Sequence, residues 1–204
     1  MSKNKLITTF ALFLIVVVGA IFFNAKSRID DRKIAVEITS YIKSKNGQSE
    51  SFEKKVSTTN YLLLNKKAVQ EYLSLKLEGG KKLDVVILNH LYVVDLVGLN
   101  SRLRQIIYDI VARCEKSKKR SHHSELSEED HIRLKGVNIL YVDAKKGSSS
   151  SRALLTKLLT KEGFPGKYNV ADLLLKSAPK KRRAEQERLK KVLPKSDHYL
   201  LFRK

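Results

Sequence analysis

Residues 83–88 read Leu-Asp-Val-Val-Ile-Leu, a nearly continuous run of β-branched and other apolar side chains. Such a run is typical of a strand that is buried on both faces of a parallel sheet. Two segments of helical spacing flank it, Ala68–Leu77, which is closed by Gly79-Gly80, and residues 99–114. Strands that alternate with helices in this way predict a mostly parallel sheet.

Other parts of the chain extend this pattern. The sequence predicts the α/β fold class, with one small Rossmann-like domain over residues 33–204 built on a mostly parallel sheet. Polar, basic insertions are expected near residues 115–131 and 176–195. The further strand-like segments are residues 33–39, 137–142 and 198–202, and the further helical segment is residues 153–159.

Composition sets limits on the class of protein. The 204 residues include 41 Lys and Arg against 21 Asp and Glu, a formal net charge of +20. Hydrophobic residues make up 42% of the chain, enough to build a core, which argues against a wholly disordered protein. A single cysteine, Cys114, excludes an internal disulfide framework and a cysteine-rich zinc module, and it suits a reducing compartment. We expect Cys114 to pack as a small hydrophobic side chain.

The N-terminal part contains an apolar segment, Leu6–Phe23 (LITTFALFLIVVVGAIFF), without a charged side chain. As a helix these residues span about 27 Å, close to the thickness of a bilayer core. The pattern predicts an uncleaved transmembrane helix at residues 6–23, with a non-cytosolic tail at 1–5 and a linker at 24–32. Because the downstream flank is the more basic, the bulk of the chain is expected in the cytosol. A cleaved signal peptide is the alternative interpretation.

Asn89-His90 directly follows the apolar run, and Asp95 lies five residues beyond His90. This NHxxxxD pattern resembles the motif of the glycerolipid acyltransferases, in which the histidine acts as base and the aspartate orients it. The phosphate-binding block of that family is missing, because residues 164–166 (FPG) lack its glutamate. We therefore predict that the protein is not an enzyme. A membrane acyltransferase that uses His90 and Asp95 as catalytic residues is the enzymatic alternative.

The same run resembles the strand that ends in the phosphoacceptor of a receiver domain. Asn89 stands where that family requires aspartate, and Asp143 is followed by Ala144 instead of a second acid, so the magnesium-binding cluster would be missing. A degenerate receiver-like signalling module is the second alternative.

No cofactor or metal ion is predicted. Residues 145–147 (KKG) lack the order of a phosphate-binding P-loop, and no GxGxxG occurs in the chain. His122, His123 and His131 lack cysteine or acidic partners at ligand spacing.

Two basic runs allow several interpretations. In order of preference they form a solvated face, contact anionic lipid headgroups, or bind nucleic acid, and they also suit a protein-docking surface. Neither run interleaves aromatic residues as single-strand binders do, so nucleic acid is the least favoured ligand. The runs consist of Lys118, Lys119 and Arg120, and of Lys180, Lys181, Arg182 and Arg183.

The layout of tail, single span and small domain resembles the peroxin-22 family of peroxisomal membrane proteins. The local likeness lies in Val137–Leu159 (VNILYVDAKKGSSSSRALLTKLL) and Ser196–Phe202 (SDHYLLF). The resemblance implies a membrane tether in peroxisome biogenesis, whose cytosolic domain docks the ubiquitin-conjugating enzyme peroxin-4 and supports recycling of the import receptor. It implies the peroxisomal membrane as the location, with the endoplasmic reticulum membrane as the alternative. Arg152 and Lys157, on the polar side of the helix at 153–159, are the expected partner contacts.

Overall fold

The computed structural model of the chain describes residues 31–48, 50–78, 80, 82–114, 126–177 and 182–201. Helices account for most of these residues, and no β-strand occurs among them. The predicted α/β class with a Rossmann-like parallel sheet is therefore wrong. The chain divides into two compact units, the first ending at Leu64 and the second beginning at Asn65.

The described part of the first unit is a pair of helices. One covers residues 31–45, and the other is α2 (Phe52–Leu64). The buried hydroxyl of Thr58 on α2 donates a 2.8 Å hydrogen bond to the carboxylate of Glu37 on the other helix. This bond joins the two helices beside their small apolar core.

Residues 33–39, a predicted strand, lie in the first of these helices. In a strand, Ile34, Val36 and Ile38 would share one face. Here Ile34 and Ile38 are buried and Val36 is exposed, so burial follows the four-residue spacing of a helix. The alternation of apolar and polar side chains at residues 33–39 therefore predicted a strand wrongly.

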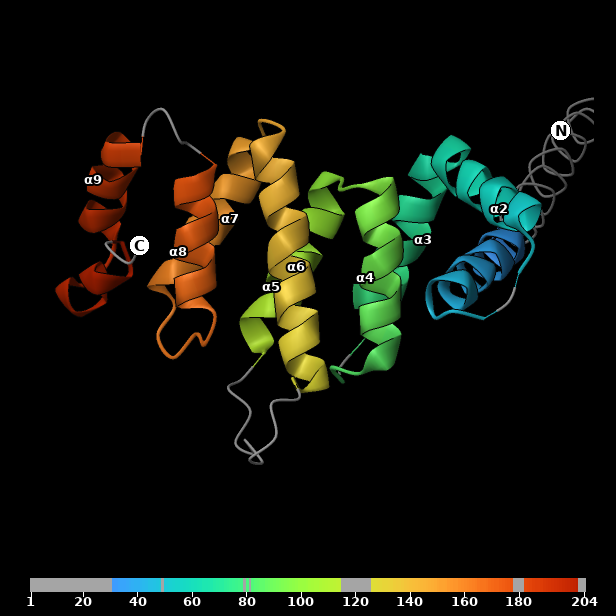
Figure 1. Cartoon of the computed structure of the whole chain (residues 1–204), viewed down its shortest axis with the longest axis horizontal. Helices are drawn as coiled ribbons and strands as arrows, with labels where there is room; N and C mark the ends of the chain where they lie inside the picture. The colour runs from blue at the N-terminus through green and yellow to red at the C-terminus, as the bar shows by residue number, and fades with distance from the viewer. Residues whose placement is uncertain are drawn as a thin grey trace, which may run out of the picture. The chain divides into compact units, whose positions relative to one another are not determined.

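The second unit stacks its helices in two layers (Figure 1). α4, α6 and α8 form one layer, and α3, α5 and α7 lie behind them, with contacts along each layer and within the pairs α3–α4, α5–α6 and α7–α8. Contacts thus join helices that are close in sequence, as in helical repeat proteins. The elements are α3 (Lys66–Glu78), α4 (Val85–Val97), α5 (Ser101–Arg113), α6 (Glu128–Lys145), α7 (Ser149–Thr160), α8 (Lys167–Lys176), α9 (Arg182–Val192) and the 3-10 helix η2 (Lys195–Leu201).

The run at residues 83–88, predicted to be a buried parallel strand, contains the start of α4. Asp84 caps this helix, because its carboxylate accepts hydrogen bonds from the backbone N–H groups of Val86 (3.0 Å) and Ile87 (3.3 Å). The helix packs against both α3 and α6, so a wide part of its surface is buried. Its continuous apolar character reflects burial between helices and not within a sheet.

Residues 137–142, another predicted strand, lie within α6. A capping box begins this helix: the N–H of Asp130 donates to Oγ of Ser127 (3.1 Å), and the N–H of Ser127 donates to Oδ2 of Asp130 (3.2 Å). Farther along, Gly136 allows close approach of α5, because a Cβ atom at this position would overlap the side chain of Val111. Contacts with α4, α5 and α7 explain why the middle of α6 is so apolar.

Three predicted helices are confirmed. Residues 68–77 lie within α3, and the helix predicted at 99–114 matches α5 closely. Residues 153–159 lie within α7, which begins earlier because the hydroxyl of Ser148 caps it. Their apolar positions recur at three and four residues, and that spacing identified them correctly.

The remaining segments differ from the predictions. The predicted closing strand is wrong, since residues 198–201 belong to η2. Of the predicted insertion at 115–131, residues 115–125 lie outside the described residues and the rest leads into α6. The second insertion, at 176–195, contains the whole of α9.

The predicted membrane segment at 6–23 and the tail at 1–5 lie outside the described residues, as does most of the linker at 24–32. In the part of the chain that the structure describes, no helix has the length and apolar character needed to cross a bilayer. Over that part, this finding contradicts the prediction of an integral membrane protein in the peroxisomal or endoplasmic reticulum membrane.

Candidate functional site

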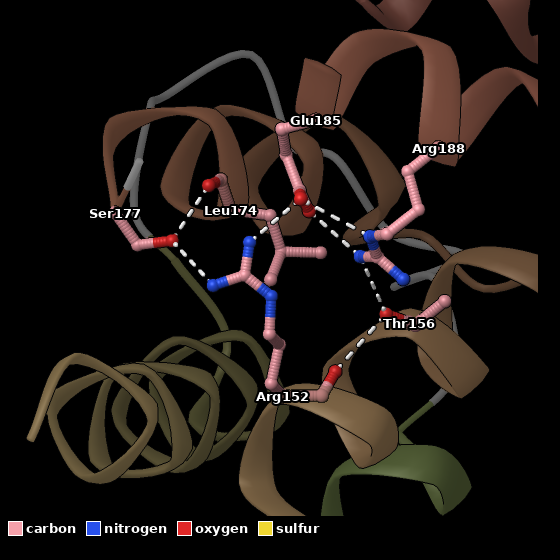
Figure 2. A network of polar contacts seen from close by, with 6 residues as sticks. All are labelled: Arg152, Thr156, Leu174, Ser177, Glu185 and Arg188. Carbon is pink, nitrogen blue, oxygen red and sulfur yellow. Dashed lines mark hydrogen bonds and ion pairs between the residues drawn. The ribbon is translucent and has the colours of Figure 1, made fainter. Parts of the chain in front are cut away.

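A buried glutamate holds the last helices of the second unit together. Glu185 on α9 is only 6% exposed, and its carboxylate lies between two arginines (Figure 2). Oε2 is 2.7 Å from Nη2 of Arg152 on α7, and Oε1 is 2.7 Å from Nη2 of Arg188 on α9. Two guanidinium groups therefore compensate the buried charge.

The two arginines extend this network to neighbouring helices. Nη2 of Arg188 donates to Oγ1 of Thr156 on α7 (3.2 Å). Nη1 of Arg152 donates to Oγ of Ser177 (3.5 Å), which donates in turn to the carbonyl oxygen of Leu174 on α8 (2.7 Å). The start of α9 is thus fixed against both α7 and α8.

The chemistry of this network is structural. Burial raises the pKa of the Glu185 carboxyl, but the hydrogen bonds and positive charges of Arg188 and Arg152 outweigh this and hold the pKa below its ordinary value. Glu185 is therefore ionised at neutral pH. A carboxylate of lowered pKa with both oxygens engaged is poorly suited to proton transfer, so its contribution is to position α9.

A second network fixes the turn between α6 and α7. Nε of Arg104 on α5 lies 3.1 Å from Oδ2 of Asp143 and 3.0 Å from Oγ of Ser151. Oγ of Ser151 also donates to Oδ2 of Asp143 at 2.5 Å. Ser148 accepts the N–H of Ser151 (3.2 Å), and Gly147 has a φ of 104°, which a glycine adopts without strain. Side chains from three helices thus hold this turn in place.

Four exposed cations lie on the two segments that these networks fix. Lys145 and Lys146 end α6, and Arg182 and Arg183 begin α9; we call these four residues the basic edge. Figure 1 shows the α6–α7 turn and the start of α9 at the same edge of the second unit. Among the described residues, no acidic side chain pairs with any of the four. Their uncompensated charge favours an anionic ligand or surface.

The structure does not bring the predicted catalytic pair together. His90 and Asp95 are five residues apart on α4, so they point about 140° away from each other around the helix axis. Nδ1 of His90 lies 2.7 Å from the carbonyl oxygen of Val86 in the preceding turn. Oδ2 of Asp95 lies 2.5 Å from Nζ of Lys135 on α6. This geometry gives the acyltransferase alternative no support.

The predicted partner contacts have different surroundings. Arg152 is partly buried and bound to Glu185, so it holds α9 in place. Lys157 is exposed, and its Nζ lies 5.0 Å from the centre of the Tyr108 ring. Lys157 alone of the two therefore has a side chain that a partner can reach readily.

Only part of the predicted basic surface can be placed. Residues 118–120 and Lys180 and Lys181 lie outside the described residues, whereas Arg182 and Arg183 belong to the basic edge. In the sequence, Lys145 and Lys146 suggested only a phosphate-binding loop, whose residue order they lack. Their place at the same edge as the start of α9 depends on packing, and no spacing in the sequence indicates it.

Cys114 is buried, and its Sγ lies 3.4 Å from the carbonyl oxygen of Ile110. Burial raises the pKa of this thiol to about 11, so it is neutral at physiological pH. Within the described ranges, no group of three or more His, Cys, Asp or Glu side chains could hold a metal ion. His122 and His123 lie outside those ranges.

The sequence did not reveal the Glu185 network. One signal was available, because Glu185 lies four residues before Leu189 and therefore shares a helix face with an apolar side chain; the structure buries both. A charged residue that shares the buried face of a very polar helix needs a partner from another element. The identity of that partner, Arg152, follows only from the packing of α7 and α9.

No protein-family profile matches the chain, and no curated protein or solved structure is significantly similar to it. The strand pattern behind the peroxin-22 resemblance is not found in the described residues, since Val137–Val142 is helical and residues 196–201 belong to η2. The resemblance and the partner that it implies therefore stay predictions without support from the fold.

Proposed function

We propose that this chain is a non-enzymatic docking protein whose second unit binds an acidic protein partner at the basic edge. The observation that supports this function is the position of four cations that have no acidic partner among the described residues, on two segments that are each fixed by an ion-pair network. Charges presented on fixed segments orient an acidic partner and accelerate its encounter with the chain.

A protein partner suits this surface better than nucleic acid does. Tight binding to a phosphate backbone relies on many neutralised phosphates, and single strands also need aromatic side chains on which bases stack. The basic edge offers four cations from two short segments, with no aromatic residue among Lys145–Ser151 or Arg182–Arg188. This arrangement matches a small acidic patch on a folded protein.

The test is a titration of the full chain against a fluorescent glutamate-rich peptide, followed by anisotropy. Replacing Lys145, Lys146, Arg182 and Arg183 by glutamine is expected to weaken binding about tenfold or more. The matched control replaces four exposed lysines around α3, Lys66, Lys67, Lys76 and Lys82, and so removes the same net charge. The control variant is expected to bind nearly as well as the unaltered chain.

Two further ligands distinguish the alternatives in the same assay. Tighter binding to duplex DNA or to anionic lipid vesicles than to the peptide would contradict a protein partner. An equal loss of peptide affinity in the basic-edge variant and in the control variant would contradict binding at the basic edge.

A recombinant peroxin-4-type ubiquitin-conjugating enzyme tests the finer prediction about the identity of the partner. Binding that is lost in the basic-edge variant would support this enzyme as the partner. No binding would exclude this enzyme and would leave the proposal of an acidic protein partner in place.

A further inference from the structure

α2 carries an apolar stripe that the described residues leave uncovered. Phe52 is 79% exposed and Leu64 is 86% exposed, and Val56 and Leu63 are 42% and 44% exposed. These positions lie on one side of the helix, and three of them line a shallow depression together with Asn60. A contiguous apolar patch of this size is often functional.

We infer that a second copy of the chain covers this stripe, through a two-fold pairing of α2 with α2. The four apolar side chains expose on the order of 500 Å². Two such patches facing each other bury about 1,000 Å² in total, which reaches the lower limit for a specific interface. A closed two-fold pair brings the stripes of both copies into one self-complementary interface.

The residue pattern favours an antiparallel arrangement centred near Thr58. In this register Phe52 of each copy faces Leu64 of the other, and Val56 faces Asn60, so apolar side chains meet at both ends of the interface. A parallel arrangement would place the two Glu53 carboxylates opposite each other and align the two helix dipoles. Both effects are unfavourable, so the antiparallel pair is the more stable of the two.

Cysteine cross-linking of the full chain tests this interface. Asn60→Cys places two thiols near the two-fold axis, within reach of a short bismaleimide. The unaltered chain is a suitable control, because its one cysteine, Cys114, is 3% exposed. We expect a cross-linked dimer in Asn60→Cys at micromolar concentration, and a cross-linked fraction about tenfold lower when Phe52→Glu is added. Circular dichroism shows whether the double variant is still helical.

A second cysteine position separates specific pairing from general association. Leu75→Cys introduces a thiol on α3, where Leu75 is 62% exposed. The inference requires that this variant gives little dimer. Equal cross-linking of the two variants would overturn it, because association would then involve some other surface. A monomer in Asn60→Cys would overturn it as well, and so would a dimer that Phe52→Glu leaves unchanged.

Discussion

Glu185 determines where the first turn of α9 lies, and therefore where Arg182 and Arg183 are presented. Its carboxylate bridges Arg152 and Arg188, which come from different helices. Both arginines are partly exposed, so solvent screens part of their interaction with the carboxylate. The residues that position the start of α9 are different from the four cations of the basic edge.

Replacing Glu185 by glutamine keeps the shape of the side chain and removes its charge. We expect the free energy of unfolding to fall by about 2 kcal/mol, because two arginines lose their shared ion pair. Urea denaturation measures this change. Glu187→Gln on the same helix is the control, since Glu187 is exposed and pairs with Lys190 at the surface, and a change below about 0.5 kcal/mol is expected there. Equal losses in the two variants would contradict the role of Glu185.

The acidic groups of both networks predict a loss of stability in acid. Burial raises the pKa of Asp143, but hydrogen bonds from Ser151, Ser148 and Arg104 hold it below its ordinary value of 3.8. The pKa of Glu185 is likewise held below 4.5. A carboxyl with a lower pKa in the folded chain contributes stability that is complete above its unfolded pKa and is lost as the pH falls through the folded value.

The free energy of unfolding is therefore expected to decline below about pH 5. Asp143→Asn should be less stable at neutral pH and should show a shallower decline. Denaturation measured at a series of pH values gives both quantities. A decline in Asp143→Asn as steep as in the unaltered chain would show that Asp143 does not contribute to the acid sensitivity.

At the scale of the helices, the sequence predicted α3, α5 and α7 and misassigned the apolar parts of α4 and α6. In α5 the apolar positions recur at three and four residues with polar residues between them, so the period is plain. α4 and α6 contact several other helices, and their continuous apolar runs also fit a strand. The local signals were the caps, Asp84 before α4 and the Ser127–Asp130 capping box before α6.

The candidate site was predictable only in part. Composition indicated the cations of residues 180–183, and their excess over acidic residues is a property of the sequence. That Lys145 and Lys146 lie at the same edge depends on how α6, α7, α8 and α9 pack. The spacing of His90 and Asp95 left a catalytic alternative open, because spacing in the sequence does not show whether two side chains meet; on α4 the two diverge.

Gly136→Ala tests the close approach of α5 and α6. Alanine normally stabilises a helix relative to glycine by about 1 kcal/mol. Here the added Cβ would overlap Val111, so we expect a net loss of about 2 kcal/mol in chemical denaturation. Asn138→Ala, at an exposed position of α6, is the control and should change stability by less than about 0.5 kcal/mol.

A double variant identifies the cause of that loss. Val111→Ala removes the methyl group that the new Cβ would overlap, so Gly136→Ala should be much less harmful in this background. Strictly additive losses from the two changes would contradict the proposed contact.

On the scale of the whole molecule, the proposed docking function rests on how the second unit is built. Its helices contact their neighbours in sequence and in their own layer. A short series of such contacts therefore places two segments that are distant in sequence, the α6–α7 turn and the start of α9, at one edge. The net charge of +20 makes general attraction to anions certain. The specific claim is that an acidic partner prefers the basic edge to the other exposed cations.

The most direct test of that claim maps where an acidic ligand binds. The full chain is mixed with the glutamate-rich peptide, treated with a carbodiimide that joins lysine to carboxylate without a spacer, and analysed by mass spectrometry. We predict that cross-links concentrate at Lys145 and Lys146 and disappear at high salt. Cross-links that are as frequent at Lys66, Lys67 and Lys76 would contradict the proposed docking function.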